Sequence, residues 1–449
     1  MIANEGDKNA PDYDPMCDKN NPRKVTFEDV SAAAFRIQSG IMKTPCLASH
    51  ITNICNAEVY LKCEFLQYTG SFKERGARNA LLQLNDQTRT RGVAAASLGN
   101  HSQGISYHGK MLNIPVTVVM PGVAPLVKLE KCRGFGANVV VHGANMMDAK
   151  KEAIRLAKEN GQVYINGYDH PDIIAGQGTI GLEILEQVPD VDAVLVPVGG
   201  GGLLAGIIIA VKHLKPSTLV YGVETDKCAS MATSLKKGEP VACDVSRTLA
   251  DGLAVGLVGY NSFFNIKPLV DKMVVVTEDW AARSILRIVE LEKYVVEGGG
   301  AVACAAILSG LVPELDGKKV VCVLSGGNID TSILSVCLDR GLVAEQRMVK
   351  FKVNVSCSPG SLARLCELIG SIGVSIKDIG QERAWLKGNI FSVRVKVVCE
   401  TTGPENVNQL RELMAANYKD VFFLKDHQGT ETTRHISLTE SLEEVHRKK

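Results

Sequence analysis

The chain has 449 residues, with 50 basic and 49 acidic side chains, 45% hydrophobic residues and only 5% aromatic residues. This length exceeds that of a usual single domain, so we expect two or more domains. Because the charge is balanced, nothing attracts the chain to nucleic acid or to an acidic membrane, and we predict neither as a partner.

The cysteines and the amino terminus indicate where the protein resides. The thirteen cysteines are scattered, and no two form a C-x-x-C pair. This pattern favours reduced thiols in the cytoplasm over a disulfide framework or a zinc site. Residues 1–24 are polar and lack the apolar core of a signal peptide, so we predict a disordered tail there. The most apolar stretch, residues 203–211, is far shorter than the ~20 residues that a bilayer requires.

Residues 25–342 alternate short apolar strands with amphipathic helices. Valine- and isoleucine-rich strands are predicted at residues 59–61, 93–96, 116–120, 139–142, 194–198, 219–224, 273–276 and 320–324. Helices are predicted between most of them, for example at residues 147–159, 178–186 and 280–291. This alternation predicts an α/β fold with parallel sheets covered on both faces, and the spacing suits two lobes better than an eight-fold barrel.

The pattern changes near residue 348. Between residues 349 and 355, every second residue is apolar, which predicts a half-buried strand of an antiparallel sheet. Helices at 361–369 and 405–416 and strands at 374–379, 390–399 and 421–424 complete a β-α-β-β-α-β order. Residues 347–426 are therefore predicted to form a ferredoxin-like module. Residues 332–347 would be its helical linker, and residues 427–449 a polar tail.

Lys73 is the first candidate catalytic residue. A lysine between Phe and Glu is ordinarily a solvated residue on a helix face. Here the preceding Thr69-Gly70-Ser71 indicates a turn and a helix cap, so Lys73 would lie in the first helical turn. The helix dipole disfavours an ammonium group at that position. Partly desolvated beside Phe72, the amine would have a lowered pKa and could form an imine with a carbonyl compound.

The second candidate is a run of four glycines between a predicted strand and an apolar helix-like segment: Gly199, Gly200, Gly201, Gly202 and then Leu203. A flexible linker would not be flanked so closely by a strand and a helix. The spacing of Gly200, Gly202 and Ala205 also fits a dinucleotide fingerprint, with Glu224 near the place of a ribose-binding acid. A P-loop would need a following Lys-Ser/Thr, which is absent from the sequence. Whether or not the turn binds a dinucleotide, bare N–H groups at a helix start favour a phosphate.

Two further turns each follow a predicted strand. Residues 97–101, Ser-Leu-Gly-Asn-His, follow one strand, and Ser325 begins a Ser-Gly-Gly-Asn turn after another. Asn100 alone is equally a helix cap, and His101 is either a catalytic base or an ordinary helix-start histidine. Together they matter more, because the carboxyl ends of parallel strands gather ligand contacts. With the amine and the anion site, these turns suit an enzyme that holds pyridoxal phosphate.

Several stretches within residues 43–330 match a known family: 61–77, 120–121, 124–125, 175–179, 222–224, 250–256 and 324–330. On these residues the chain resembles the fold-type II pyridoxal-phosphate enzymes of the tryptophan synthase β type, and most closely the serine/threonine dehydratases (threonine ammonia-lyases). A dehydrogenase would explain the glycines but not Lys73, Asn100 or Ser325.

The resemblance implies a role for each residue of the cofactor site. Lys73 would hold the cofactor covalently and later move the Cα proton. Gly199, Gly200, Gly201 and Gly202, with the amide of Leu203, would bind its phosphate. Phe72 would pack on its ring, and Asn100 would contact its 3′-oxygen.

Ser325 would face the pyridine nitrogen of the cofactor. A serine hydroxyl cannot keep that nitrogen protonated as a carboxylate would, which favours β-elimination over transamination. The substrate carboxylate would bind the loop Ser97, Leu98, Gly99, Asn100 and His101. Relatives bind a stimulating monovalent or divalent cation where this chain has Glu224, the carbonyl of Cys228, and Ser230.

The C-terminal module resembles an ACT domain, the amino-acid-sensing unit appended to many such dehydratases. Its effector loop would be Ser358, Pro359, Gly360, Ser361 and Leu362. The family often has an aspartate just before this loop, where Cys357 stands here. Dimerisation without a ligand therefore stays open as the alternative role of the module.

The resemblance implies a pyridoxal-phosphate-dependent L-threonine/L-serine dehydratase that releases 2-oxobutanoate or pyruvate plus ammonia. Its partners would be a small amino-acid substrate, a candidate amino-acid effector, and further copies of the chain in a homodimer or homotetramer. Related racemases have a serine, as a proton donor, where this chain has Leu98, so racemisation is not expected. The alternatives are a hydroxyaspartate dehydratase, another fold-type II lyase or synthase, and an ACT-based sensing protein with weak catalysis.

Overall fold

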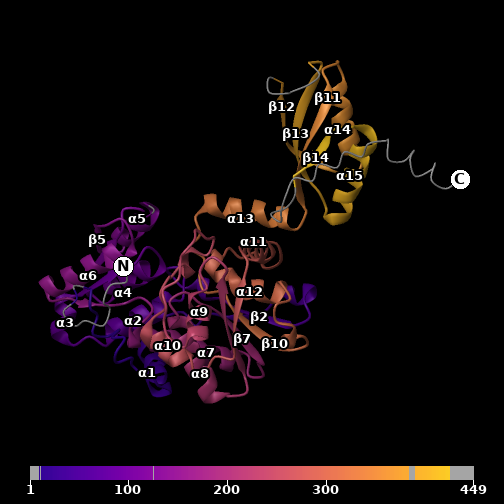
Figure 1. Cartoon of the computed structure of the whole chain (residues 1–449). Coiled ribbons are helices and arrows are strands. Elements are labelled where there is room, and N and C mark those ends of the chain that lie inside the picture. The colour runs from indigo at the N-terminus through magenta and orange to yellow at the C-terminus, as the bar shows by residue number, and fades with distance from the viewer. Residues whose placement is uncertain (1–9, 11, 125, 384–389, 425–449) are drawn as a thin grey trace. The chain divides into compact units, whose positions relative to one another are not determined.

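The computed structural model describes residues 10, 12–124, 126–383 and 390–424. The chain divides into two units, Met1–Leu338 and Asp339–Lys449 (Figure 1). We refer to them as the N-terminal unit and the C-terminal unit. Among the described residues, no helix is long and apolar enough to cross a membrane.

The larger sheet of the N-terminal unit has the strand order β1-β2-β10-β7-β8-β9. Its edge strand β1 runs antiparallel to β2, and the other neighbours are parallel. The bounds are Cys46–Ala48 for β1, Glu58–Lys62 for β2, Lys319–Val323 for β10, Ala193–Pro197 for β7, Leu219–Thr225 for β8 and Lys272–Val276 for β9. The predicted strands of this sheet are confirmed within one or two residues, and β1 was missed.

Both faces of this sheet are buried, because alternate residues of one strand enter different cores. In β10, Cys322 belongs to the core on the side of α11 and α12, Glu278–Arg287 and Gly298–Leu308. The adjacent Val321 and Val323 belong to the core with α7 and α8, Pro171–Gln187 and Gly202–Leu214. Burial on two faces explains the continuous apolar runs in the sequence. Figure 1 shows α7 and α8 together beside β7.

The smaller sheet has the order β5-β4-β3-β6, all parallel. Its strands are Asn138–Val141, Val116–Met120, Val93–Ala96 and Val163–Tyr164, in that order. The other helices of the unit are α1 (Phe27–Ile37), α2 (Lys73–Leu82), α3 (Asp86–Arg91), α4 (Asn100–Met111), α5 (Leu126–Gly134), α6 (Met146–Asn160), α9 (Ser230–Lys237) and α10 (Tyr260–Ile266). Helix α13, Thr331–Ala344, runs across the boundary between the units. The predicted two-lobed α/β arrangement with parallel sheets is therefore confirmed.

The segment of residues 12–24 corrects one prediction, because it is not a disordered tail. Two asparagines of α10 bind its backbone: Asn261 Oδ1 accepts from the N–H of Arg23 at 2.7 Å, and Asn265 Nδ2 donates to the carbonyl of Arg23 at 2.9 Å. The two asparagines lie more than 230 residues further along the chain, so no local sequence pattern indicates the docking. The rest of the predicted tail lies mostly outside the described residues.

The C-terminal unit has the predicted β-α-β-β-α-β order. Its elements are β11 (Met348–Ser356), α14 (Ser361–Ser371), β12 (Ser375–Glu382), β13 (Ser392–Glu400), α15 (Pro404–Asn417) and β14 (Val421–Phe423). The strands form an antiparallel sheet in the order β12-β13-β11-β14. Alternate residues such as Phe351, Val353 and Val395 pack with Leu365 and Leu410 of the two helices. The predicted tail at 427–449 lies outside the described residues.

Candidate active site

Lys73 is the first residue of α2. Its Nζ donates a 2.6 Å hydrogen bond to the carbonyl of Gly167 and lies 5.0 Å from the centroid of the Phe72 ring. Loss of solvation lowers the pKa of Lys73 to about 8, and the Glu297 carboxylate acts in the opposite direction. An appreciable share of the amine is therefore unprotonated close to neutral pH, the state in which lysine attacks a carbonyl carbon.

The start of α2 differs from the predicted cap. The N-cap is Phe72, and no side chain caps the helix. Ser71 is buried, and its hydroxyl has no hydrogen-bond partner among the described residues. The backbone of Ser71 instead pairs with Gly326, and the N–H of Phe72 donates to the carbonyl of Ser325 at 3.0 Å. The turn after β10 thus fixes the start of α2 and brings Ser325 close to Lys73.

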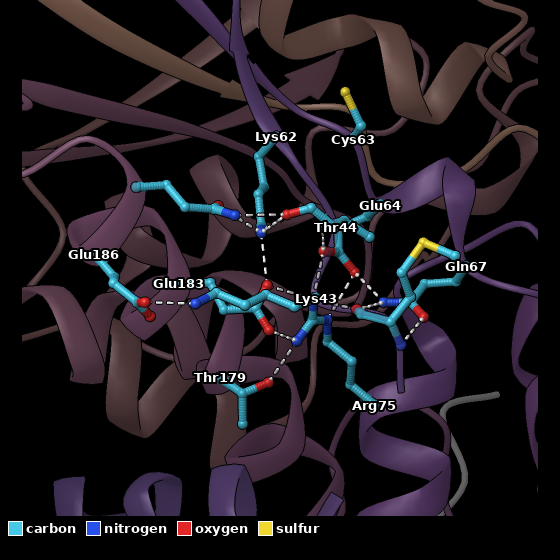
Figure 2. Close-up of polar contacts among 12 residues, drawn as sticks. Lys43, Thr44, Lys62, Cys63, Glu64, Gln67, Arg75, Thr179, Glu183 and Glu186 are labelled. Atoms are coloured by element: carbon cyan, nitrogen blue, oxygen red, sulfur yellow. Dashed lines mark hydrogen bonds and ion pairs between the residues drawn. The ribbon is translucent and has the colours of Figure 1, made fainter. Parts of the chain in front are cut away.

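A cluster of buried charges anchors the rest of α2 (Figure 2). The guanidinium of Arg75 is 1% exposed and contacts Glu64 at 2.8 Å and Glu183 at 2.6 Å. The side chain of Lys62 is fully buried, and its Nζ donates to Glu183 and to the carbonyl of Thr44, both at 2.6 Å. The cluster ties α2 to α7 and to β2 with its following turn. Because charged residues are seldom fully buried, sequence reasoning missed it.

The four-glycine turn connects β7 to α8. Gly201 is the N-cap of α8 with φ = +100°, a conformation that favours glycine. A Cβ at Gly200 would lie 2.3 Å from the Tyr168 ring, and one at Gly202 would lie 2.2 Å from the Tyr168 carbonyl oxygen. The first N–H groups of a helix lack intrahelical partners, so this turn offers an anion site. Tyr168 follows the residue that accepts from Lys73, so one segment supports both features.

Asn100 is the first residue of α4 and is held by two side chains. Its Nδ2 donates to Glu297 Oε1 at 2.7 Å, and its Oδ1 accepts from Asn328 Nδ2 at 2.9 Å. Asn328 follows β10, and Glu297 lies against Gly326 of the same turn. The structure therefore brings the turn with Asn100 to the turn with Ser325. Glu297 was missed, although an acid before the glycine triplet 298–300 is a readable signal.

His101 lies beside this group. It is 3% exposed, and neither ring nitrogen has a hydrogen-bond partner among the described residues. Burial, and then the charge of Lys73, lower the pKa of His101 to about 3. The imidazole is thus neutral at physiological pH and free to accept a hydrogen bond. Whether it acts as a base or only packs at the helix start stays a prediction.

In the predicted substrate loop, one residue packs against the core and another lies near a lysine of α5. Leu98 packs against the core of the smaller lobe. Gly99 is close to Lys128 of α5, whose Nζ would lie 4.0 Å from a Cβ at that glycine. Lys128 also forms an ion pair at 3.1 Å with Asp251, between residues of the two lobes. Sequence reasoning missed both partners of this pair.

The residues of the predicted cation site lie together. Glu224 is the penultimate residue of β8, and its two carboxylate oxygens accept from the N–H groups of Met231 and Ala232 at 2.7 and 2.9 Å. The hydroxyl of Ser230 and the thiol of Cys228 both contact the carbonyl of Val255. Burial raises the pKa of Glu224 to about 7. Within the described residues, no group of three or more His, Cys, Asp or Glu side chains is arranged to hold a metal ion.

The predicted effector loop is an exposed turn between β11 and α14. Gly360 is the N-cap of α14 with φ = +85°. The N–H of Ser361 donates to the carbonyl of Ser358 at 3.2 Å, which closes the turn. Ser358, Pro359 and Gly360 are exposed, and so is the preceding Cys357.

A cavity of about 1180 Å³ lies away from these turns. It is lined by residues of four separate segments within residues 19–269, among them Phe27, His213, Phe263 and Leu269. His213 belongs to the last turn of α8, whereas the glycine turn is at the first. The candidate active site is therefore located by side-chain chemistry rather than by the size of this cavity.

Fold and site together describe an α/β enzyme with a reactive lysine beside an anion-binding turn. Residues 37–326 match the family described as pyridoxal-phosphate-dependent enzymes. The chain is 39% identical to an L-threonine ammonia-lyase of Thermotoga maritima over 88% of this chain and 98% of that protein. It is 42% identical to the catabolic L-threonine dehydratase TdcB of Escherichia coli over 69% of this chain and 95% of that protein.

Solved structures give the same result. Threonine deaminase isoform 2 of Solanum lycopersicum is 34% identical, with a TM-score of 0.67 over 71% of this chain and 95% of that one. A serine racemase of Dictyostelium discoideum is 39% identical, with a TM-score of 0.65 over 68% of this chain and 99% of that one. The chain belongs to the family of pyridoxal-phosphate-dependent enzymes. Membership rules out the dinucleotide interpretation of the glycine run.

The residues present fit this cofactor. The glycine turn can pack closely on Tyr168 because Gly200 and Gly202 have no Cβ, and the N–H groups at the start of α8 suit the cofactor phosphate. The amine of Lys73, with its lowered pKa, suits the aldehyde of the cofactor. The unpaired hydroxyl of Ser71 and the unpaired ring of His101 are buried polar groups nearby that a bound molecule would satisfy.

Proposed function

We propose that the protein is an ammonia-lyase that dehydrates and deaminates L-threonine and L-serine, giving 2-oxobutanoate or pyruvate and ammonia. The observation that carries this proposal is the packing of three segments around Lys73. Its Nζ donates to Gly167, beside the Tyr168 that packs on the glycine turn, and the N–H of the preceding Phe72 donates to the Ser325 carbonyl. Asn100 binds Glu297, which lies against Gly326 of the turn with Ser325. The substrate is supported by the names of the relatives, an L-threonine ammonia-lyase and an L-threonine dehydratase.

Lys73 has two tasks in this proposal. Bound pyridoxal phosphate supplies an electron-withdrawing ring that acidifies the Cα–H of an attached amino acid. The Lys73 amine holds the cofactor and, when the substrate takes its place, removes the Cα proton. Its pKa of about 8 makes it a base that is available near neutral pH and still able to return a proton.

The surrounding residues bind and orient. The N–H groups of Gly199 to Gly202 and of Leu203 hold the phosphate at the start of α8. Phe72 would pack beside the cofactor ring, and the amide of Asn100 would contact its 3′-oxygen. Ser325 donates or accepts at the pyridine nitrogen without charging it, which favours loss of the β-hydroxyl.

The loop of Ser97 to His101 receives the substrate carboxylate. Leu98 cannot carry a proton, and its side chain supports the core of the smaller lobe. A second proton donor on the opposite face of the substrate is therefore missing from this position, and we expect elimination without racemisation. Hydroxyaspartate remains an alternative substrate because Lys128 lies near Gly99, where it could bind a second carboxylate.

The C-terminal unit is proposed to be an ACT domain that senses an amino acid. The β-α-β-β-α-β order and the strand order β12-β13-β11-β14 are those of a ferredoxin-like module. The match to the Thermotoga maritima enzyme covers 88% of the chain, so it extends past Leu338 into this unit. The candidate effector loop is Ser358 to Leu362. Glu224, Cys228 and Ser230 are the candidate cation site, and a homodimer or homotetramer the candidate assembly.

A substrate panel tests the proposed function. We expect 2-oxobutanoate from L-threonine and pyruvate from L-serine, with ammonia in equal amounts and with bound pyridoxal phosphate. Lys73→Ala should abolish release of both products while keeping some cofactor, and borohydride should fix the cofactor to Lys73 in the unmodified chain. Product from hydroxyaspartate alone, or an adduct on another lysine, would overturn the assignment.

A further inference from the structure

Glu297 lies at the junction of the site's turns and is used by none of the proposed steps. It is 7% exposed and is the N-cap residue of α12. An acidic N-cap side chain usually accepts from the first N–H groups of its own helix. Here it makes no such bond. The carboxylate turns instead to Asn100 Nδ2, at 2.7 Å.

The surroundings of Glu297 are built closely around its carboxylate. A Cβ at Gly326 would lie 2.5 Å from Oε1, and one at Gly252 would lie 3.6 Å from it. The backbone N–H of Glu297 donates to the carbonyl of Gly326 at 3.0 Å. Glycines on two sides therefore leave room for a carboxylate directed at Asn100.

Glu297 interacts electrostatically with three charged groups from three other elements. The carboxylate packs against Gly326, whose backbone pairs with Ser71, two residues before Lys73 of α2. At this position its negative charge favours the protonated form of the Lys73 amine. Asp251, before α12 in the chain, repels it, and Lys128 of α5 attracts it. The other titratable group facing Lys73 is His101, which is neutral at physiological pH.

We propose that Glu297 is a positioning residue that fixes the amide of Asn100 and supplies the counter-charge of the Lys73 amine. This inference rests on the proposed role of Lys73. With Oε1 as acceptor, the Nδ2 of Asn100 is held toward Glu297 while Asn328 holds Oδ1. The amide therefore cannot flip, and its second Nδ2 hydrogen keeps one direction. The same carboxylate favours the charged form of Lys73.

The charge of Glu297 acts on the pKa of Lys73. Burial, and then repulsion by Asp251, raise the pKa of Glu297 to about 7. Above that pH the carboxylate is charged and opposes the loss of a proton from Lys73, whose pKa is already lowered to about 8 by burial. Removing the charge should therefore lower the pKa of Lys73 further, so that the amine is free at lower pH.

Two substitutions separate the two tasks. Glu297→Gln keeps an oxygen that can accept from Asn100 but removes the charge. Glu297→Met has a similar length and removes both. The matched control is Glu278→Gln, because Glu278 is also buried and accepts hydrogen bonds, but from Thr248 and Leu249 rather than from Asn100.

The pKa of Lys73 is measured in full-length protein freed of cofactor, from the pH dependence of its acetylation followed by mass spectrometry. Both substitutions at Glu297 should lower the midpoint by about one pH unit. Cofactor affinity, from titration of absorbance, should fall about fivefold or more in Glu297→Met and little in Glu297→Gln. Glu278→Gln should change neither.

An unchanged Lys73 midpoint in both variants would overturn the counter-charge role, and equal cofactor affinity in Glu297→Met and the unmodified chain would overturn the positioning role. The lysine titration needs no substrate. It can therefore succeed even if the substrate panel contradicts the proposed ammonia-lyase activity, and fail while that activity stands.

Discussion

The two units contain the same local turn in different settings. In each, a strand is followed by a turn that contains a glycine N-cap with positive φ: Gly201 at +100° and Gly360 at +85°. A Cβ at Gly201 would lie 2.8 Å from Met231 and 2.9 Å from Ser262, whereas at Gly360 it would meet no described atom within 4 Å. Local backbone geometry therefore does not determine how closely a turn is enclosed. The segments packed around the turn determine this.

The largest effect should come from filling the enclosed turn. In Gly202→Ala, the Cβ would lie 2.2 Å from the carbonyl oxygen of Tyr168, so the backbone must move. A displacement of about 1 Å at a reacting centre costs on the order of a hundredfold in kcat/KM. Cofactor content after dialysis and kcat/KM measure the effect. Gly370→Ala in α14, where a Cβ meets no described atom, is the control. Full cofactor retention in Gly202→Ala would show that the phosphate binds elsewhere.

The second effect tests the scaffold behind the enclosed turn. Arg75→Met leaves the buried carboxylate of Glu64 and the partly buried carboxylate of Glu183 without their guanidinium partner. We expect the free energy of unfolding to fall by about 3–5 kcal/mol, measured by urea denaturation. Arg364→Met in α14 is the matched control, because Arg364 is exposed at a similar place in its helix and should change stability by less than about 0.5 kcal/mol. Equal losses in the two variants would mean that the buried cluster does not stabilise the unit.

The third effect concerns ligand sensing by the open turn. If an amino acid binds at Ser358 to Leu362, its coupling to substrate affinity should be ~1–3 kcal/mol, or roughly 5- to 150-fold. Kinetics and calorimetry with a panel of amino acids measure it. A chain ending at Ala344 should keep its chemistry and lose the response. The Escherichia coli relative, matched over 95% of its length by 69% of this chain, is the natural reference for that shorter form. If no amino acid alters the full chain, the unit is structural.

The smallest effect should come from the open turn itself. Gly360→Ala introduces only the strain of a positive φ, since no described atom is near the new Cβ. The C-terminal unit should lose about 1 kcal/mol of stability, while cofactor content and turnover stay unchanged. Thermal unfolding and a cofactor assay check this. A loss of cofactor in Gly360→Ala would contradict the independence of the two turns.

The sequence was sufficient for features that depend on local pattern. The buried parallel strands, the four-glycine turn and the helix that begins at Lys73 are each written in neighbouring residues. What it could not show depends on distant partners. Arg75 looks like a surface residue until Glu64 and Glu183 are seen beside it. Ser71 looked like a cap, yet the pairing of its backbone with Gly326 sets the helix start instead.

The docked segment at residues 12–24 has a consequence for how the protein is made. The hydrogen bond from Asn261 to the carbonyl of Met16 joins residues 245 positions apart. At about 5–20 residues per second, synthesis of that interval takes roughly 10–50 s. During this time the first segment has been made but its binding helix has not. The segment is polar, so while it is exposed to water and undocked it offers little apolar surface for aggregation. Protease sensitivity of the segment in chains stalled before residue 260, and resistance in chains stalled well beyond the unit, would show this order of events.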